Sequence, residues 1–249
     1  MDQRSQDQSS VGQGSLGQRP VDPRPEHTYS QFDTDLYRLR SAATTMAGLV
    51  ERQFLRAVDA VIDEDIGLVA QVLADEVEVN RMHMQTDLLC NRMIAKMQPI
   101  AVDLREILAA LHMNNDLERT GDESKKIALK ARALQGRTRP IATDRIARMA
   151  DIARDMLRLA VDAYIRQDPQ VAVELAKRDD EVDHLRNELI EELTTVMGTT
   201  PQSVAAALAL IFVVQSIERV GDHATNISEY VVTVVDGTDT RHSRTAAIG

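Results

Sequence analysis

Residues 217–227, "IERVGDHATNI", place two acids and a glycine inside an otherwise apolar stretch. Nearly the same phrase, "LERTGDESKKI", stands one hundred residues earlier, at 117–127. In a helix, acids four positions apart repel each other, and an interior glycine costs about 1 kcal/mol relative to alanine. Two such penalties at equivalent places need a common reason, and they indicate that the chain is built from two related halves.

The repetition extends beyond this motif. "AVDAVIDED" at 57–65 recurs as "AVDAYIRQD" at 160–168, and "EVEVN" at 76–80 parallels "DDEVD" at 179–183, both displaced by 103 residues. The displacement falls to 100 at the motif, which places a net three-residue deletion just before the last helix of the second copy. A period of this size corresponds to one small domain and not to one unit of a solenoid.

Helices are the expected elements of each copy. The chain has four tyrosines, three phenylalanines and no tryptophan, against ten methionines and abundant alanine and leucine, which favours closely packed helices. Proline is tolerated in the first turn of a helix and not in its interior, so Pro99, Pro140, Pro169 and Pro201 each mark a helix start. No segment alternates with a period of two, so no sheet is expected. We predict six long helices, near residues 31–63, 66–96, 100–135, 141–167, 169–197 and 201–236.

The predicted fold is therefore all-α, a tandem repeat of two three-helix bundles. The first bundle is assigned to residues 31–136 and the second to residues 140–236. Residues 1–30 are rich in Gln, Ser, Gly and Pro and are predicted to form a disordered tail, and residues 237–249 a flexible C-terminal tail. Three glycines and one capping threonine mark the expected helix ends: Gly136, Gly198, Gly237 and Thr200.

Composition excludes several classes of function. The net charge of −10 repels nucleic-acid backbones and anionic membrane surfaces, so neither is expected as a partner. Cys90 is the only cysteine, which rules out an intrachain disulfide and fits a reducing cytoplasm. The first thirty residues lack the apolar segment of a secretory signal. The longest apolar run, residues 204–214, is shorter than the roughly 18 residues of a membrane span, so we expect a soluble protein without membrane insertion.

The repeated acids form candidate metal sites. In a helix, positions i and i+4 lie on one face, so each motif presents two carboxylates together. The preceding helix of each copy carries a matching pair of oxygen donors. If the two helices are antiparallel neighbours, four side-chain oxygens face one another, which is the chemistry of hard or borderline divalent cations. The candidate ligands are Glu76, Asn80, Glu118 and Asp122 in the first copy, and Asp179, Asp183, Glu218 and Asp222 in the second.

Simpler interpretations remain open beside this one. The acids could pair with Arg119, Arg219 and other bases, as most helical charges do. A ferritin-like di-iron site is disfavoured, because "EVDH" at 181–184 is the only Glu-x-x-His in the chain. His223 is expected to be a solvated histidine on a helix face, and Cys90 a buried structural thiol. No phosphate-binding glycine loop or nucleophile elbow is present, so no catalytic site is predicted.

The motifs resemble those of a known family. "NDLERTGDESKKI", "QSIERVGDHATNI" and "QPIAVDLREI" at 98–107, in a tandem three-helix repeat, are similar to the PhoU family of phosphate-uptake regulators over about residues 29–236. The resemblance implies a cytoplasmic, non-enzymatic protein that binds clusters of divalent or iron-type metal ions through paired E(D)xxxD motifs. These motifs match at Glu118 and Asp122, Glu218 and Asp222, and Asp179 and Asp183, and less fully at Glu76 and Asn80.

The resemblance also implies partners. Members of this family act with the ATPase of the phosphate ABC transporter and with a sensor histidine kinase to restrain phosphate uptake and the starvation response. They often form homodimers, although no heptad seam specifies one here. Two departures matter: Asn80 replaces a carboxylate, which predicts a weaker first site, and the "DLR" of residues 103–105 is not repeated in the second copy. A purely structural helical interaction protein and a carboxylate-metal enzyme are the alternatives.

Overall fold

The computed structural model describes residues 30–137, 141 and 143–237, and within this part of the chain the fold is all-α. Every predicted helix is present, with bounds within about four residues of those expected. The two predicted tails lie almost entirely outside the described residues. The helices are α1 (Ser30–Ile62), α2 (Ile66–Met97), α3 (Ala101–Leu134), α4 (Asp144–Arg166), α5 (Val171–Thr199) and α6 (Val204–Asp236), with a one-turn 3₁₀ helix, η1 (Pro201–Ser203), before α6.

The helix ends follow the expected chemistry in part. Gly136 and Gly237 come just after α3 and α6 and have φ of +69° and +70°, the left-handed conformation that glycine adopts without strain. Gly198, by contrast, lies within the last turn of α5. Thr200 precedes Pro201 as predicted, but its side chain forms no capping hydrogen bond, and Pro201 opens η1 and not α6 itself.

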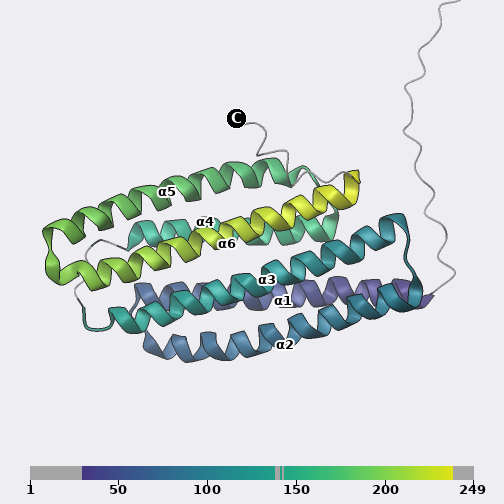
Figure 1. The fold of residues 1–249 in the computed structure, drawn as a ribbon, viewed down its shortest axis with the longest axis horizontal. Coiled ribbons are helices and arrows are strands. Elements are labelled where there is room, and N and C mark those ends of the chain that lie inside the picture. Colours follow the sequence, from purple (N-terminus) through teal and green to yellow (C-terminus); the bar gives the residue numbers. More distant parts are fainter. Residues whose placement is uncertain (1–29, 138–140, 142, 238–249) are drawn as a thin grey trace, which may run out of the picture.

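The two copies lie side by side and share one core (Figure 1). Helices α1–α3 pack on one another, as do α4–α6, and the copies meet where α3 packs on α6 and α1 on α4. The larger of two clusters of buried apolar side chains runs through both copies and includes the fully buried Phe54, Met113, Met156 and Ile217. The apolar core is therefore continuous across the boundary between the two three-helix copies.

Helix α6 is the most apolar element. By length and composition alone, the segment Pro201–Val235 could cross a membrane, since an 18-residue window has a mean hydropathy of 1.7. However, 56% of that window is buried inside the protein, where α6 packs against α3, α4 and α5. This combination is typical of the core helix of a bundle, and it makes the apolar composition weak evidence for a membrane span.

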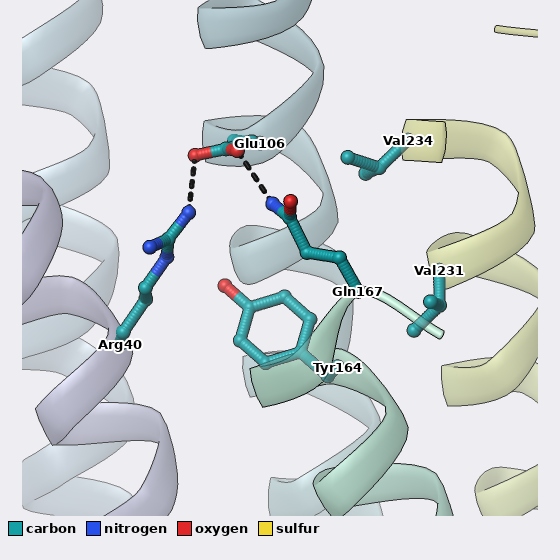
Figure 2. Close-up of a pocket in the computed structure, with 6 residues that line it drawn as sticks. All are labelled: Arg40, Glu106, Tyr164, Gln167, Val231 and Val234. Atoms are coloured by element: carbon teal, nitrogen blue, oxygen red, sulfur yellow. Dashed lines mark hydrogen bonds and ion pairs between the residues drawn. The ribbon is translucent and has the colours of Figure 1, made fainter. Parts of the chain in front are cut away.

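A buried glutamate joins the two copies near one end of the bundle (Figure 2). Glu106 of α3 accepts a hydrogen bond from Arg40 Nη2 of α1 at 2.9 Å and another from Gln167 Nε2, at the end of α4, at 2.6 Å. The cavity beside these residues has a volume of about 10 Å³, enough for about one water molecule. We therefore interpret this cluster as a structural link between the copies and not as a ligand site.

Candidate functional site

The first predicted cluster forms between α2 and α3. Glu76 is 5% exposed, and its carboxylate accepts hydrogen bonds from Gln53 Nε2 at 3.0 Å and from Asn80 Nδ2 at 3.2 Å. The Lys125 ammonium nitrogen lies 3.5 Å from Glu76 Oε1 and 3.6 Å from Asp122 Oδ1. Lys125 therefore supplies an internal positive charge to this cluster. Its spacing of three residues from Asp122 was visible in the sequence, although sequence reasoning did not single it out.

Glu118 belongs to the same cluster. Partial burial raises the pKa of its carboxyl above the usual value, and the negative charge of Asp122 raises it further, with a smaller contribution from Glu76. His83 and Arg119 act in the opposite direction. In the first copy, Glu118 of α3 therefore lies near enough to Asp122 on its own helix and to Glu76 of α2 for these charges to act on it.

The second cluster forms in the same way between α5 and α6. Partial burial, followed by the negative charges of Glu218, Asp179 and Asp183, raises the pKa of Asp222 to about 6. Arg186 is the base that sequence reasoning missed here, although it stands three residues after Asp183. Its Nη1 donates to Glu218 Oε1 at 2.6 Å, and its Nη2 lies 3.6 Å from Asp183 Oδ1. Arg186 thus contacts two of the four carboxylates of this cluster.

The two motif glycines differ in how closely their neighbours approach. A Cβ atom built on Gly121 would lie 3.0 Å from Gln53 Oε1, 3.2 Å from Val79 Cγ1 and 3.3 Å from Glu76 Oε2. A Cβ atom on Gly221 would meet nothing nearer than Met156 Cε at 3.5 Å, which is an ordinary contact. Close approach of the helices therefore explains the glycine of the first copy and does not explain that of the second.

The oxygen donors are of the chemical type that a hard cation prefers, but their positions in this structure do not form a metal site. Carboxylate and amide oxygens are the ligands that divalent cations of this class prefer. Among residues 30–137, 141 and 143–237, however, no three Asp, Glu, His or Cys side chains converge on one point as they would around a metal ion. Lys125 and Arg186 hold some of the donor oxygens, so a metal ion would compete with these bases for the carboxylates.

The motif arginines do not neutralise their own carboxylates through ion pairs. Arg219 Nη1 lies 3.5 Å from Glu123 Oε1, on the opposite helix, and Arg119 forms no ion pair or hydrogen bond within the described residues. The prediction that His223 is solvated was wrong. Its side chain is 12% exposed, and its Nδ1 lies 2.9 Å from Oδ1 of the buried Asp116 of α3, because α6 packs against α3 at this point.

The remaining sequence candidates lie apart from both clusters. His184 is exposed and pairs with Glu188 at 2.9 Å, and Glu181 pairs with Arg148 at 2.7 Å, so "EVDH" does not point into the core as a di-iron motif would. Cys90 is buried as predicted, and this burial raises the pKa of its thiol to about 12. A thiol with so high a pKa is not a reactive nucleophile.

A hollow opens on the seam where α3 and α6 meet. The contacts Arg105–Gly237, Glu123–Arg219 and Lys130–Phe212 show that these helices are antiparallel. Because equivalent residues are one hundred positions apart, the antiparallel pairing relates the two motifs by an approximate two-fold axis. Around that axis lies a hollow of about 350 Å³, which we call the seam hollow. It is lined by Arg119, Asp122, Glu123 and Lys126 of α3 and by Arg219, Asp222 and His223 of α6.

Comparison with known proteins agrees with this duplicated architecture. The PhoU domain matches residues 43–131 and again residues 146–231, once in each copy. The chain belongs to the PhoU family. Each PhoU match contains one complete glutamate–aspartate motif, which confirms the family resemblance inferred from the sequence.

Two relatives illustrate the similarity within the PhoU family. A phosphate-specific transport system accessory protein PhoU homolog of Pseudomonas putida is 40% identical over 218 residues, 87% of this chain and 85% of that protein. A homolog of the same description from Pseudomonas aeruginosa is 38% identical over 223 residues, 89% of this chain and 92% of that protein. The crystal structure of PhoU from Pseudomonas aeruginosa superimposes with a TM-score of 0.80, covering 84% of this chain and 100% of that one.

Proposed function

We propose that this protein is a non-enzymatic accessory regulator of phosphate transport. It binds divalent or iron-type metal ions at its two clusters and acts as a cytoplasmic adaptor. Its partners are the ATPase of a phosphate ABC transporter and a sensor histidine kinase, and it restrains phosphate uptake and the starvation response when phosphate is plentiful. Family membership, together with relatives described as phosphate-specific transport system accessory proteins, supports the assignment to phosphate transport.

The crowding of carboxylates in the second cluster is the observation that carries the metal proposal. Partial burial raises the pKa of Asp222, and the negative charges of Glu218, Asp179 and Asp183 raise it further, to about 6 against a usual value near 3.8. Arg186 contacts Glu218 and Asp183. A divalent cation would relieve the mutual repulsion of the four carboxylates, so the cluster gains from binding one.

The first cluster should gain less stability from binding a metal ion. One of its four positions, Asn80, is an amide, and Lys125 already lies between Glu76 and Asp122. The buried Glu76 also accepts hydrogen bonds from Gln53 and Asn80, which stabilise its ionised form without a metal. We therefore expect the second cluster to hold metal more tightly than the first.

Elemental analysis of protein purified without chelator tests this order. The variant Glu218→Gln with Asp222→Asn should lose most of the bound metal, whereas the matched variant Glu118→Gln with Asp122→Asn should lose less. Lys125→Met removes the competing base of the first cluster and should increase its metal content. Protein with no metal above background, or with the same metal content in all four forms, would refute the proposal.

The adaptor role is tested in cells. A tagged protein should recover the transporter ATPase or the sensor kinase from phosphate-replete cells, and deletion of its gene should release the starvation response, read as alkaline phosphatase activity. Recovery of neither partner, with unchanged phosphatase activity in the deletion strain, would contradict it. Sedimentation of the metal-loaded protein tests the homodimer that the family implies.

A structural helical protein without bound metal is the second candidate. The pairs Arg186–Glu218 at 2.6 Å and Lys125–Glu76 at 3.5 Å favour it, because each cluster already contains an internal base. Under this alternative, the wild type and the cluster variants contain equal background metal and differ only in stability. The elemental analysis above therefore separates the two candidates.

A further inference from the structure

The seam hollow lies between the two clusters and shares an acid with each. Asp122 belongs to the first cluster and Asp222 to the second, and both line the hollow. Three basic side chains, Arg119, Lys126 and Arg219, line it as well, together with the acid Glu123. The hollow therefore has three basic and three acidic side chains beside His223, so their formal charges balance.

Metal at the clusters changes this balance. If the carboxylates of Asp122 and Asp222 are committed to metal ions, only Glu123 remains to offset the three cations. The hollow then has an excess of positive charge, with two arginines that approach it from opposite helices. Arginine presents a planar fork of N–H donors that matches the oxygens of a phosphate group.

We propose that the seam hollow binds a phosphate group when both clusters hold metal. The proposal rests on the metal binding of the proposed function. It adds a phosphate ligand whose binding depends on the bound metal. Arg119 is the first contact, since it has no ion-pair partner among the residues that the structure describes. Arg219, whose side chain is 53% exposed and stands at 3.5 Å from Glu123, is the second.

The size of the hollow agrees with a small ligand. At about 350 Å³ it is at the lower end of the range of small-molecule sites, roughly 300–1,000 Å³. That volume accommodates a phosphate ion with water, or the phosphate groups of a larger molecule. It does not accommodate a whole nucleotide in a closed pocket, so we assign the site to the phosphate group itself.

Glu123 provides selectivity among oxyanions. Its side chain is buried, its Oε1 accepts from Lys126 Nζ at 2.8 Å, and its Oε2 has no hydrogen-bond partner within the described residues. The terminal torsion of a glutamate is soft, so the carboxylate can turn this oxygen toward the hollow. At neutral pH phosphate retains at least one O–H, which a carboxylate accepts, whereas sulfate has none. Glu123 therefore favours phosphate over sulfate.

Isothermal titration calorimetry tests the proposal with inorganic phosphate as the probe. Protein saturated with Mg²⁺ should bind phosphate, and chelator-treated protein should bind it at least about tenfold more weakly. Mg²⁺ binding is measured separately on the same samples. If the protein binds neither Mg²⁺ nor any metal found by the elemental analysis, the proposed function is refuted, whereas metal binding without any phosphate binding would refute the seam site alone.

Substitutions locate the ligand. Arg119→Gln and Arg219→Gln should each weaken phosphate binding about tenfold or more, as expected for the loss of a charged hydrogen bond, without changing Mg²⁺ binding. Arg132→Gln, on an exposed arginine of α3 outside the hollow, is the matched control and should have no effect. Equal phosphate affinity in all four forms would place the phosphate on the metal ions and overturn the proposal.

Glu123→Gln tests the selectivity. The wild type should prefer phosphate to sulfate, and the variant should bind the two with about equal affinity, because its amide donates to sulfate. Wild-type protein that binds sulfate as well as phosphate would refute the role of Glu123. Competition by ATP then shows whether a phosphate group on a larger molecule also enters the hollow. Displacement of bound phosphate by ATP would show that a phosphate group on a larger molecule also enters the hollow. No displacement would indicate that free phosphate is the ligand.

Discussion

Substitution of the two motif glycines by alanine should have opposite effects. Gly121 and Gly221 are equivalent by sequence, and both lie inside helices, so the intrinsic gain in helix propensity is the same, about 1 kcal/mol. Their surroundings differ. At Gly121 the new methyl group would lie 3.0–3.3 Å from atoms of three residues of α1 and α2, whereas at Gly221 its nearest neighbour would be 3.5 Å away.

The cost at Gly121 comes from neighbours that have little room to move. Gln53 and Val79 are fully buried, Glu76 is 5% exposed, and Gln53 donates a hydrogen bond to Glu76. Overpacking of this kind costs about 1–3 kcal/mol, and a weakened buried hydrogen bond adds about 1 kcal/mol. After the gain in helix propensity, Gly121→Ala should destabilise the protein by about 1–3 kcal/mol. Gly221→Ala has no such cost and should stabilise it by about 0.5–1 kcal/mol.

Urea denaturation of chelator-treated protein, followed by circular dichroism, measures this difference. The two variants should move the urea midpoint in opposite directions. The slope of the free energy of unfolding against urea concentration should not change, because unfolding exposes the same surface as in the wild type. A Gly121→Ala variant as stable as Gly221→Ala would show that α2 and α3 do not approach as closely as described. Destabilisation by Gly221→Ala would refute the claim that a methyl group fits at that position.

Three further predictions concern single side chains in chelator-treated protein. Glu106→Ala leaves Arg40 and Gln167 without their acceptor and should lower the melting temperature by about 4–8 °C, a loss of about 2 kcal/mol, in a thermal scan. His223→Ala leaves the carboxylate of the buried Asp116 with the Asn226 contact at 3.4 Å and no other hydrogen bond among the described residues, and it should cost about 1–3 kcal/mol in urea denaturation. The pKa of Asp222 is raised to about 6, so its ionisation opposes folding above that pH and has no effect below the unfolded pKa, near 4. Asp222→Asn should therefore raise the urea midpoint at about pH 7.5 and leave it unchanged at about pH 4. A wild-type melting temperature for Glu106→Ala, a wild-type midpoint for His223→Ala, or a pH-independent effect of Asp222→Asn would contradict the respective argument.

The fold could be predicted from the sequence because its signals are local and occur twice. Prolines and glycines delimit the helices, and the change of displacement from 103 to 100 residues locates the shortened turn before α6. The structure has three residues, 98–100, between α2 and α3, whereas Thr200 alone separates α5 from η1. The opposition of the acid pairs across α2–α3 and α5–α6 was also predictable, because i,i+4 spacing and antiparallel neighbours leave few other arrangements.

The packing between the copies could not be predicted in the same way. No sequence pattern showed that α3 would lie against α6, and the errors follow from that gap. His223 was expected in solvent because its own helix gives no sign of Asp116, which is 107 residues away. The simpler interpretation of the motif would pair Arg219 with its neighbouring acids, whereas its partner Glu123 lies on the opposite helix. The seam hollow exists only because of this antiparallel pairing.

A comparison of equivalent residues in the two copies explains why clusters built on the same sequence motif differ in chemistry. Gln53 of α1 and Met156 of α4 are equivalent, 103 residues apart, and each lies against the glycine of its own copy. Gln53 donates a hydrogen bond to Glu76 at 3.0 Å, whereas the thioether of Met156 has no donor to offer Asp179, the equivalent acid. The first cluster is thus stabilised from within by an amide and by Lys125. In the second cluster all four candidate ligands are carboxylates, and the charges of Glu218, Asp179 and Asp183 add to the effect of burial on the pKa of Asp222. We therefore expect a metal ion to stabilise the second cluster more than the first.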